Sequence, residues 1–266
     1  MKKIIAGTFI VTLLFSCHQE NALERRDINT DSIVADSSVK LTDELNTPIC
    51  SVHLSVKYVK GKGANMLNTA FLRNGIMLPD YMEYSNGDGI RESVDSFVVR
   101  YLADYVDFYR KIYKNDKSHP ELYNNRYSLN TSILSEKENI ITYVANISSY
   151  GGGLYDTKQT LARNFDAENG RLITLNDILM HGYEKMLKDI ILNKLFEKYD
   201  VDDVEGLKKK YIFADGYIYI PDNFIIGRDN ITFIYCEDEI APHEEGEIRI
   251  KINNSDLNDL KKPDIK

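Results

Sequence analysis

Short runs of alternating apolar and polar residues, separated by turn residues, make up much of the chain after Cys50. This period of two is typical of β-strands that are buried on one face. Two runs after Pro120 are joined by a short turn and predict a hairpin, which favours antiparallel pairing. The predicted strands cover residues 50–58, 127–134, 140–149, 155–165, 216–220 with 224–226, 231–236 and 247–252.

Helical periodicity occupies the gaps between these strands. Between Val94 and Ile112, apolar side chains recur at steps of three and four and form one wide stripe, which predicts a long helix packed against a core. Shorter helices are predicted around residues 66–71, after Thr174 and over 183–199. Together these elements predict an α+β fold, with a mainly antiparallel sheet and one long and two or three shorter helices packed on it.

The N-terminus has the pattern of an export signal. Lys2 and Lys3 precede an apolar run that ends in Leu14-Phe15-Ser16-Cys17, and this run is shorter than the roughly 20 residues that span a bilayer. The last four residues resemble the lipobox of bacterial lipoproteins, in which the cysteine is lipidated. We therefore interpret residues 1–17 as a Bacteroidetes-type lipoprotein signal peptide and Cys17 as the lipidation site. An ordinary signal peptide is the alternative.

The segment after the signal differs in composition from the rest of the chain. Residues 18–47 show no sustained period and are rich in Asn, Asp, Ser and Thr, which predicts a flexible tether. Residues 48–258 are predicted to form a single domain, with a weaker subdivision into 48–120 and 121–258. Signal and tether together indicate a protein of the cell envelope, lipid-anchored to the outer membrane, on its periplasmic or its surface side.

The charge balance limits the partners. Lys and Arg number 33 against 41 Asp and Glu, a net charge of −8, which argues against nonspecific nucleic-acid binding and suits a cationic partner. The five histidines and three cysteines are scattered, so no metal and no cofactor is predicted. Cys50 and Cys236 are either bridged or two buried free thiols.

Two loops carry the residues that are the strongest candidates for binding or catalysis. Tyr150-Gly151-Gly152-Gly153 joins two predicted strands, and such a glycine run either approaches a ligand or makes a tight bend. The loop 237–246 gathers five carboxylates and one imidazole, where a paired-acid hydrolase or a metal site is one interpretation and a solvated acidic loop the other. No catalytic residue is assigned. The candidate binding or structural residues are Tyr150, Gly151, Gly152, Gly153, Tyr235, Glu239, Pro242, His243 and Gly246.

These two loops resemble motifs of the RsiV-like domain family, found in extracellular parts of lysozyme-sensing anti-sigma factors and beside peptidoglycan deacetylase domains. The resemblance covers residues 140–252. It rests on Tyr150-Gly151-Gly152-Gly153 with Asn164-Phe165-Asp166, and on Ile231–Tyr235 leading to Glu239-Ile240-Ala241-Pro242 and Gly246. The chain departs from the family at Leu154, where the family has histidine, and at Asp238 and His243, where it has tyrosines.

The resemblance implies the fold and an envelope location, and it leaves room for binding without establishing an activity. The leading hypothesis is a non-catalytic module that binds an extracellular, lysozyme-like protein or cell-wall glycan (peptidoglycan), held to the membrane by its N-terminal lipid. One alternative is that the motifs are a fold signature without a ligand. The other is an envelope hydrolase that acts on glycan or peptide through the acidic loop 237–245.

Overall fold

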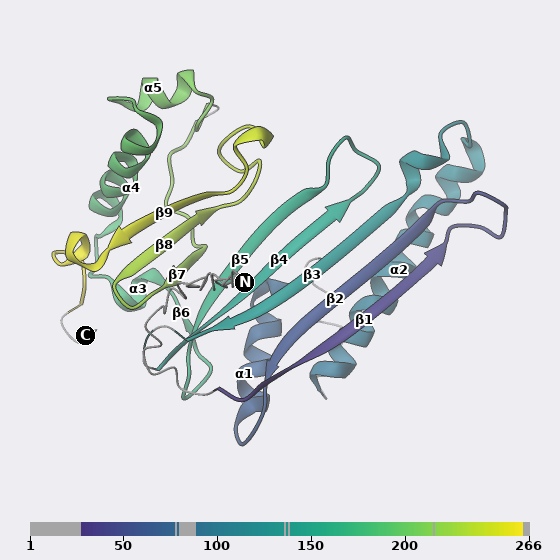
Figure 1. The fold of residues 1–266 in the computed structure, drawn as a ribbon, viewed down its shortest axis with the longest axis horizontal. Coiled ribbons are helices and arrows are strands. Elements are labelled where there is room, and N and C mark those ends of the chain that lie inside the picture. The colour runs from purple at the N-terminus through teal and green to yellow at the C-terminus, as the bar shows by residue number, and fades with distance from the viewer. Residues whose placement is uncertain are drawn as a thin grey trace, which may run out of the picture.

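The computed structural model describes residues 28–77, 79, 89–135, 137, 139–214 and 216–262. The predicted signal peptide, Cys17 and the first part of the predicted tether lie outside these residues. Within them the chain forms two β-sheets, each with its own helices, as Figure 1 shows. The predicted α+β class with mainly antiparallel strands is confirmed. None of the helices in the described ranges is long and apolar enough to cross a membrane.

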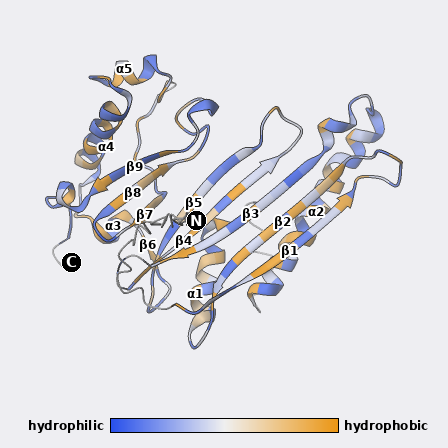
Figure 2. Cartoon of the chain, viewed as in Figure 1, coloured by the Kyte–Doolittle hydropathy of each residue, from blue (hydrophilic) through white to orange (hydrophobic). Residues whose placement is uncertain are grey.

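The larger sheet has six strands in sequence order, and all its neighbours pair antiparallel except β2 and β3, which are parallel. Parallel neighbours need a long crossover, and the helices between them supply it. The strands are β1 (Thr30–Lys40), β2 (Ile49–Val59), β3 (Asn125–Leu134), β4 (Ile140–Tyr150), β5 (Thr157–Asp166) and β6 (Leu172–Ile173). Hydrophobic and hydrophilic residues alternate along β2, as expected for a strand covered on one face (Figure 2).

The crossover helices cover one face of this sheet. The crossover runs through α1 (Ala64–Phe71), a π-helical turn (Leu72–Ile76), α2 (Ile90–Asn115) and a 3-10 turn (Pro120–Tyr123). The core between helices and strands is aromatic: the ring of Phe71 stacks on Tyr143 at 4.4 Å between centroids, and Phe97 is buried beside Tyr127. The aromatic stripe of the long helix therefore packs partly into the core, although Phe108 is exposed.

The smaller sheet lies at the C-terminal end and has its own core. Three antiparallel strands, β7 (Phe224–Ile226), β8 (Asn230–Tyr235) and β9 (Ile248–Asn253), pack against α4 (Glu184–Tyr199). The other elements are α3 (Leu175–Ile178), α5 (Val204–Lys209) and 3-10 turns at His243–Glu245 and Asn254–Leu257. The short helix predicted after Thr174 is present, and Thr174 and Asp177 form a capping box at its start.

Two buried asparagines join the sheets where β5 meets β7. Nδ2 of Asn164 donates to the carbonyl of Phe224 at 2.8 Å, and the amide of Ile226 donates to Oδ1 of Asn164 at 3.1 Å. Asn223 makes the reciprocal pair of bonds with the backbone of β5. The side-chain amides thus satisfy backbone groups that a strand ladder would otherwise pair.

Three sequence predictions need correction. Residues 30–40 are not a flexible tether, because they form β1, which pairs with β2 along its whole length. An edge strand buries one face only, and Ile33 is the single fully buried residue of β1. The composition of β1 is therefore as polar as that of a linker. The subdivision at 120/121 is also wrong, since β2 and β3 share one sheet and one core. Residues 216–220 form no strand.

Candidate binding surface

The two motif loops, far apart in the sequence, meet in the structure. The ring of Tyr155, in the loop between β4 and β5, stacks on the imidazole of His243, in the loop between β8 and β9. The ring centroids are 4.5 Å apart and the planes differ by 22°. Both loops lie at the same edge of the molecule in Figure 1. The stacked pair therefore joins a loop of the larger sheet to a loop of the smaller one.

Only the middle glycine of the β4–β5 loop is required by its surroundings. Gly152 has a φ of +80°, and a Cβ at this position would lie 2.0 Å from the carbonyl oxygen of Leu122. A Cβ added at Gly151 or at Gly153 would have no neighbour closer than 3.8 Å. The glycine run thus makes a tight bend against the 3-10 turn, which is the plainer of its two interpretations.

The tip of this loop is apolar and open to solvent. Leu154 is 91% exposed and Tyr155 is 62% exposed. Tyr150, at the base of the loop, lies instead under the guanidinium of Arg126, 4.6 Å from the ring centroid, and Arg126 is paired with Asp156. Exposed apolar side chains at a loop tip that is fixed at its base are typical of a contact surface.

Glu239, in the β8–β9 loop, holds that loop together. Its Oε2 accepts the backbone N–H of Cys236 at 2.6 Å, and its Oε1 accepts the hydroxyl of Tyr219. The hydroxyl of Tyr235 donates to the carbonyl of Tyr219 at 2.7 Å. The candidate residues Tyr235 and Glu239 are thus linked through Tyr219, which the sequence did not indicate. Burial, followed by the Glu239 carboxylate, raises the pKa of Tyr219, which keeps its hydroxyl protonated as a donor.

The loop returns to β9 through a short turn. Pro242 has a φ of −59° and precedes the 3-10 turn, while Gly246 has a φ of +63° and ends it. Nothing lies within 4 Å of a Cβ position at Gly246, so its left-handed backbone alone favours glycine. Pro242 and Gly246 therefore have structural roles in this loop.

Three ionisable side chains converge beside the turn. Nδ1 of His243 lies 3.1 Å from Oδ2 of Asp238 and 3.4 Å from Oε1 of Glu237. The hydrogen bond to Asp238, with the charges of the neighbouring acids, raises the pKa of His243 above its ordinary value. The imidazole therefore stays protonated to a higher pH than an isolated histidine does.

Exposed tyrosines continue the surface on the other side of Asp238. A shallow hollow of about 530 Å³ is lined by Tyr211, Tyr217, Tyr219 and the segment 238–242. Tyr217 is 93% exposed, and Tyr211 is also exposed. We refer to Leu154, Tyr155, Tyr211, Tyr217, Asp238 and His243 as the paired-loop surface.

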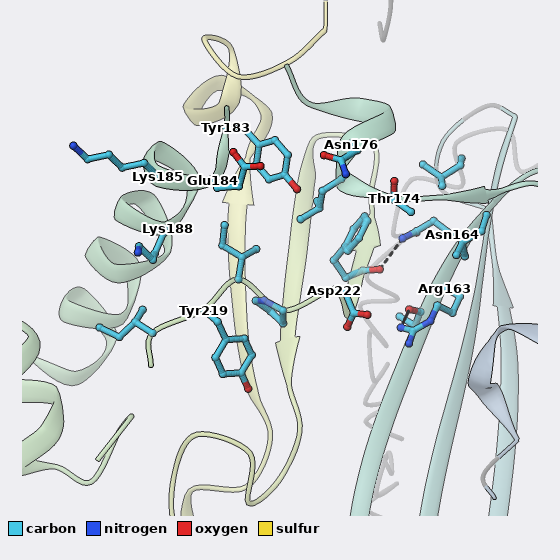
Figure 3. A pocket seen from close by; sticks show the side chains of 18 residues that line it. Arg163, Asn164, Thr174, Asn176, Tyr183, Glu184, Lys185, Lys188, Tyr219 and Asp222 are labelled. Atoms are coloured by element: carbon cyan, nitrogen blue, oxygen red, sulfur yellow. Dashed lines mark hydrogen bonds between the residues drawn. The ribbon is translucent and has the colours of Figure 1, made fainter. Parts of the chain in front are cut away.

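A larger cavity lies between the two sheets, shown in Figure 3. It has a volume of about 700 Å³ and is lined by β5, the segment from β6 to α3, the start of α4 and residues 218–224. Its wall carries apolar side chains such as Ile218 and Phe224, together with the charged residues Arg163 and Asp222, which are labelled in Figure 3. A cavity of this size and mixed lining is suited to a small ligand.

Both described cysteines are free, so no disulfide joins Cys50 to Cys236. Burial raises the pKa of Cys50 to about 12 and that of Cys236 to about 11. Sγ of Cys236 donates to the carbonyl of Thr160 at 3.4 Å, at the junction of the sheets. Of the two alternatives from the sequence, free thiols are the one observed.

Sequence reasoning found both loops but not the contact between them. The signal available was Leu154-Tyr155, two apolar residues directly after a glycine run in a loop, which is unusual in a solvated turn. The tyrosines at 211 and 217 and the cavity between the sheets had no local signal, because their residues come together only through the tertiary fold.

The comparisons with known proteins concern the fold. Residues 176–255 match the model of a family described as a protein of unknown function, DUF3298. No protein with curated annotation matches the sequence. The matched residues hold α4, the smaller sheet and the β8–β9 loop.

Two crystal structures resemble the whole described architecture. A member of the DUF3298 family from Bacteroides fragilis has a TM-score of 0.78 at 22% identity, over 89% of this chain and 94% of that chain. A DUF3298 family protein from Pseudomonas aeruginosa has a TM-score of 0.59 at 13% identity, over 89% of this chain and 95% of that chain. The chain therefore contains a region that matches the DUF3298 model and shares its fold with two proteins of that family.

Proposed function

We propose that the protein is a non-catalytic envelope lipoprotein whose paired-loop surface binds a cationic extracellular protein of the lysozyme kind. The stacking of Tyr155 on His243 carries the proposal, because it unites the two motif loops into one exposed surface. Both loops are also the stretches that resemble the RsiV-like family. The binding role belongs to the surface rather than to any single residue.

The composition of the paired-loop surface supports a protein partner. Tyrosine is enriched at the centres of protein interfaces because it combines a large apolar area with a polar group and little flexibility. Acids surround these rings, including Asp238 and the exposed Glu244, and acidic groups accelerate encounter with a basic partner.

The local backbone is also held in costly conformations. Tyr211 and Phe213 have φ values of +62° and +52°, a region that bulky residues seldom adopt. Such strain persists where the surrounding structure enforces it, and it is common at binding sites.

The lipid anchor is the second part of the proposal. The lipobox-like run ending at Cys17 supports it, and a cysteine bearing several acyl chains would be held firmly in a membrane. Residues 18–29 separate Cys17 from β1, and a chain of that length reaches at most about 40 Å when fully extended. The folded part would therefore work close to the membrane surface.

The hydrogen bonds of Glu239 favour a binding role over the alternative of a hydrolase. Both of its carboxylate oxygens already accept hydrogen bonds within the loop. A general acid or base must exchange a proton with a substrate, and this carboxylate would first have to give up bonds that shape the loop.

The test measures binding of the full chain to lysozyme and to purified peptidoglycan. Leu154→Arg places a cation on the paired-loop surface, and we expect at least about tenfold weaker lysozyme binding because like charges repel. Val99→Arg is the matched control, since Val99 is an exposed apolar residue on the outer side of α2 and should leave binding unchanged.

Four outcomes would overturn parts of the proposal. No lysozyme binding at tens of micromolar refutes the cationic partner. Binding to peptidoglycan alone makes the surface a glycan site. Release of fragments that stops in Glu239→Gln would favour the hydrolase. Membrane association that persists in Cys17→Ala would refute the lipid anchor.

A further inference from the structure

We propose that Glu237, Asp238 and His243 form a binding site for a divalent transition-metal ion of the zinc class. The three side chains each offer one ligand atom, and these atoms all lie within 4.8 Å of one another. The residues belong to one loop, but the turn at His243–Glu245 folds the imidazole back over the two acids. The sequence places these residues in one loop but does not show that their side chains converge.

The two distances from the imidazole match those between ligands of one ion. Nδ1 of His243 is 3.1 Å from Oδ2 of Asp238 and 3.4 Å from Oε1 of Glu237. A tetrahedral zinc ion with bonds of about 2.1 Å holds its ligand atoms about 3.4 Å apart. An ion could therefore bind with only small movements of the side chains.

Glu237 supplies an independent reason to expect a cation. Its side chain is only 10% exposed, and its Oε1 is shielded from solvent and accepts no hydrogen bond from the described residues. A buried carboxylate oxygen without a hydrogen-bond donor is costly, so such an atom is generally explained by a missing ligand or ion. The atom lies next to Nδ1 of His243, inside the cluster.

The neighbouring lysine and arginine side chains do not pair with Glu237. Lys158 and Arg249 line a hollow together with Glu237, but neither forms an ion pair with it within the described part of the chain. Arg249 is paired with Glu247 instead. The nearest cationic partner of Glu237 is therefore His243, in its protonated form.

The loop holds the ligands in place independently of any ion. The hydrogen bonds of Glu239 fix the backbone beside the cluster, and Asp238 adopts a φ of +64°, which directs its side chain toward His243. Tyr155 stacks on the imidazole and fixes its plane. Groups that orient a ligand in this way strengthen metal binding.

The ligand types favour zinc over calcium or magnesium. Calcium and magnesium take oxygen ligands almost alone, whereas imidazole with carboxylates suits zinc and its neighbours. Three protein ligands leave a fourth position for water or for a group of a partner. The metal site does not depend on the proposed function, although a bound ion would stiffen the contact between the two loops.

The experiment titrates the full chain with zinc chloride by calorimetry, with no protein partner present, and repeats the titration with magnesium chloride. We expect one equivalent of Zn²⁺ and no comparable binding of Mg²⁺. Glu237→Gln and Asp238→Asn should each weaken Zn²⁺ binding at least about tenfold. Glu244→Gln removes one negative charge from the same loop outside the cluster and should bind as the unchanged chain does.

Two results would overturn the site. One is Zn²⁺ affinity in Glu237→Gln and Asp238→Asn equal to that of the unchanged chain. The other comes from Co²⁺, used as a spectroscopic substitute for Zn²⁺. An intense absorption band from thiolate ligation of Co²⁺ would assign the ion to a cysteine. Asp238 is 49% exposed and asparagine tolerates its left-handed backbone, so Asp238→Asn should fold, and circular dichroism checks this.

Discussion

The two sheets differ in how they use their backbone. In the larger sheet the non-glycine residues with left-handed backbone, among those described, are Asn46 and Asn139, and asparagine adopts that conformation easily. In the C-terminal part they are Asp200, Tyr211, Phe213 and Asp238, two of them bulky aromatics. The larger sheet is therefore built from relaxed turns, whereas costly conformations gather beside the paired-loop surface.

The difference indicates that the larger sheet mainly supplies the core, while the C-terminal part supplies most of the candidate site. The larger sheet buries a continuous aromatic core beneath α1 and α2 and contributes only Leu154 and Tyr155 to the paired-loop surface. The segment between α5 and β7 and the β8–β9 loop contribute the remaining members of that surface, and the β8–β9 loop holds the proposed metal ligands. The two sheets depend on each other at the asparagine junction, and this dependence can be tested.

Asn164→Ala should have the largest effect on stability. The change removes two hydrogen bonds to β7 and one from the hydroxyl of Thr142, and leaves backbone groups of Phe224 and Ile226 buried without partners. We expect a loss of about 3 kcal/mol in the free energy of unfolding, measured by urea denaturation. Asn146→Ala is the control, because Asn146 is exposed; equal losses in both variants would show that Asn164 does not couple the sheets.

Ile33→Ala tests whether β1 belongs to the larger sheet. Ile33 is buried against that core, whereas its neighbour Val34 is 57% exposed on the opposite face. We expect Ile33→Ala to lower the free energy of unfolding by about 2 kcal/mol and Val34→Ala by less than about 0.5 kcal/mol. If residues 30–40 were a tether, neither substitution would change the unfolding midpoint.

Much of the larger sheet was predictable because its signals are local. The hairpin of β3 and β4 and the long helix α2 follow from periods of two and of three to four residues. The same reasoning failed at β1, where an edge strand with one fully buried side chain has the composition of a linker. It also failed at residues 216–220, which alternate like a strand but pair with none.

The candidate site was predictable only in parts. The sequence indicates Glu239 as a candidate binding or structural residue, and in the structure it accepts the backbone N–H of Cys236. Sequential carboxylates on a loop usually point apart into water, and one histidine beside them is not a zinc triad, so the sequence assigns no metal to this loop. No local rule shows that a turn brings His243 back over Glu237, or that Tyr155 arrives from another sheet to stack on it.

Each of the two regions carries one free cysteine. The smallest expected effect concerns the rates at which these two thiols are alkylated. A thiolate reacts with iodoacetamide and a thiol does not, so the raised pKa values keep both residues slow at pH 8. Because the pKa of Cys236 is about 11, its labelling rate should rise about tenfold for each pH unit from 7 to 9. Cys50 is fully buried and should react only when the larger sheet opens.

Peptide mass spectrometry measures both rates in one sample. In the Asn164→Ala background we expect faster labelling of Cys236, whose thiol bonds to Thr160 at the junction, while Cys50 stays slow. A rate for Cys236 that levels off near pH 8 would contradict its raised pKa. Equal acceleration at both cysteines would mean that the two sheets open together, and that the smaller sheet does not unfold before the larger one.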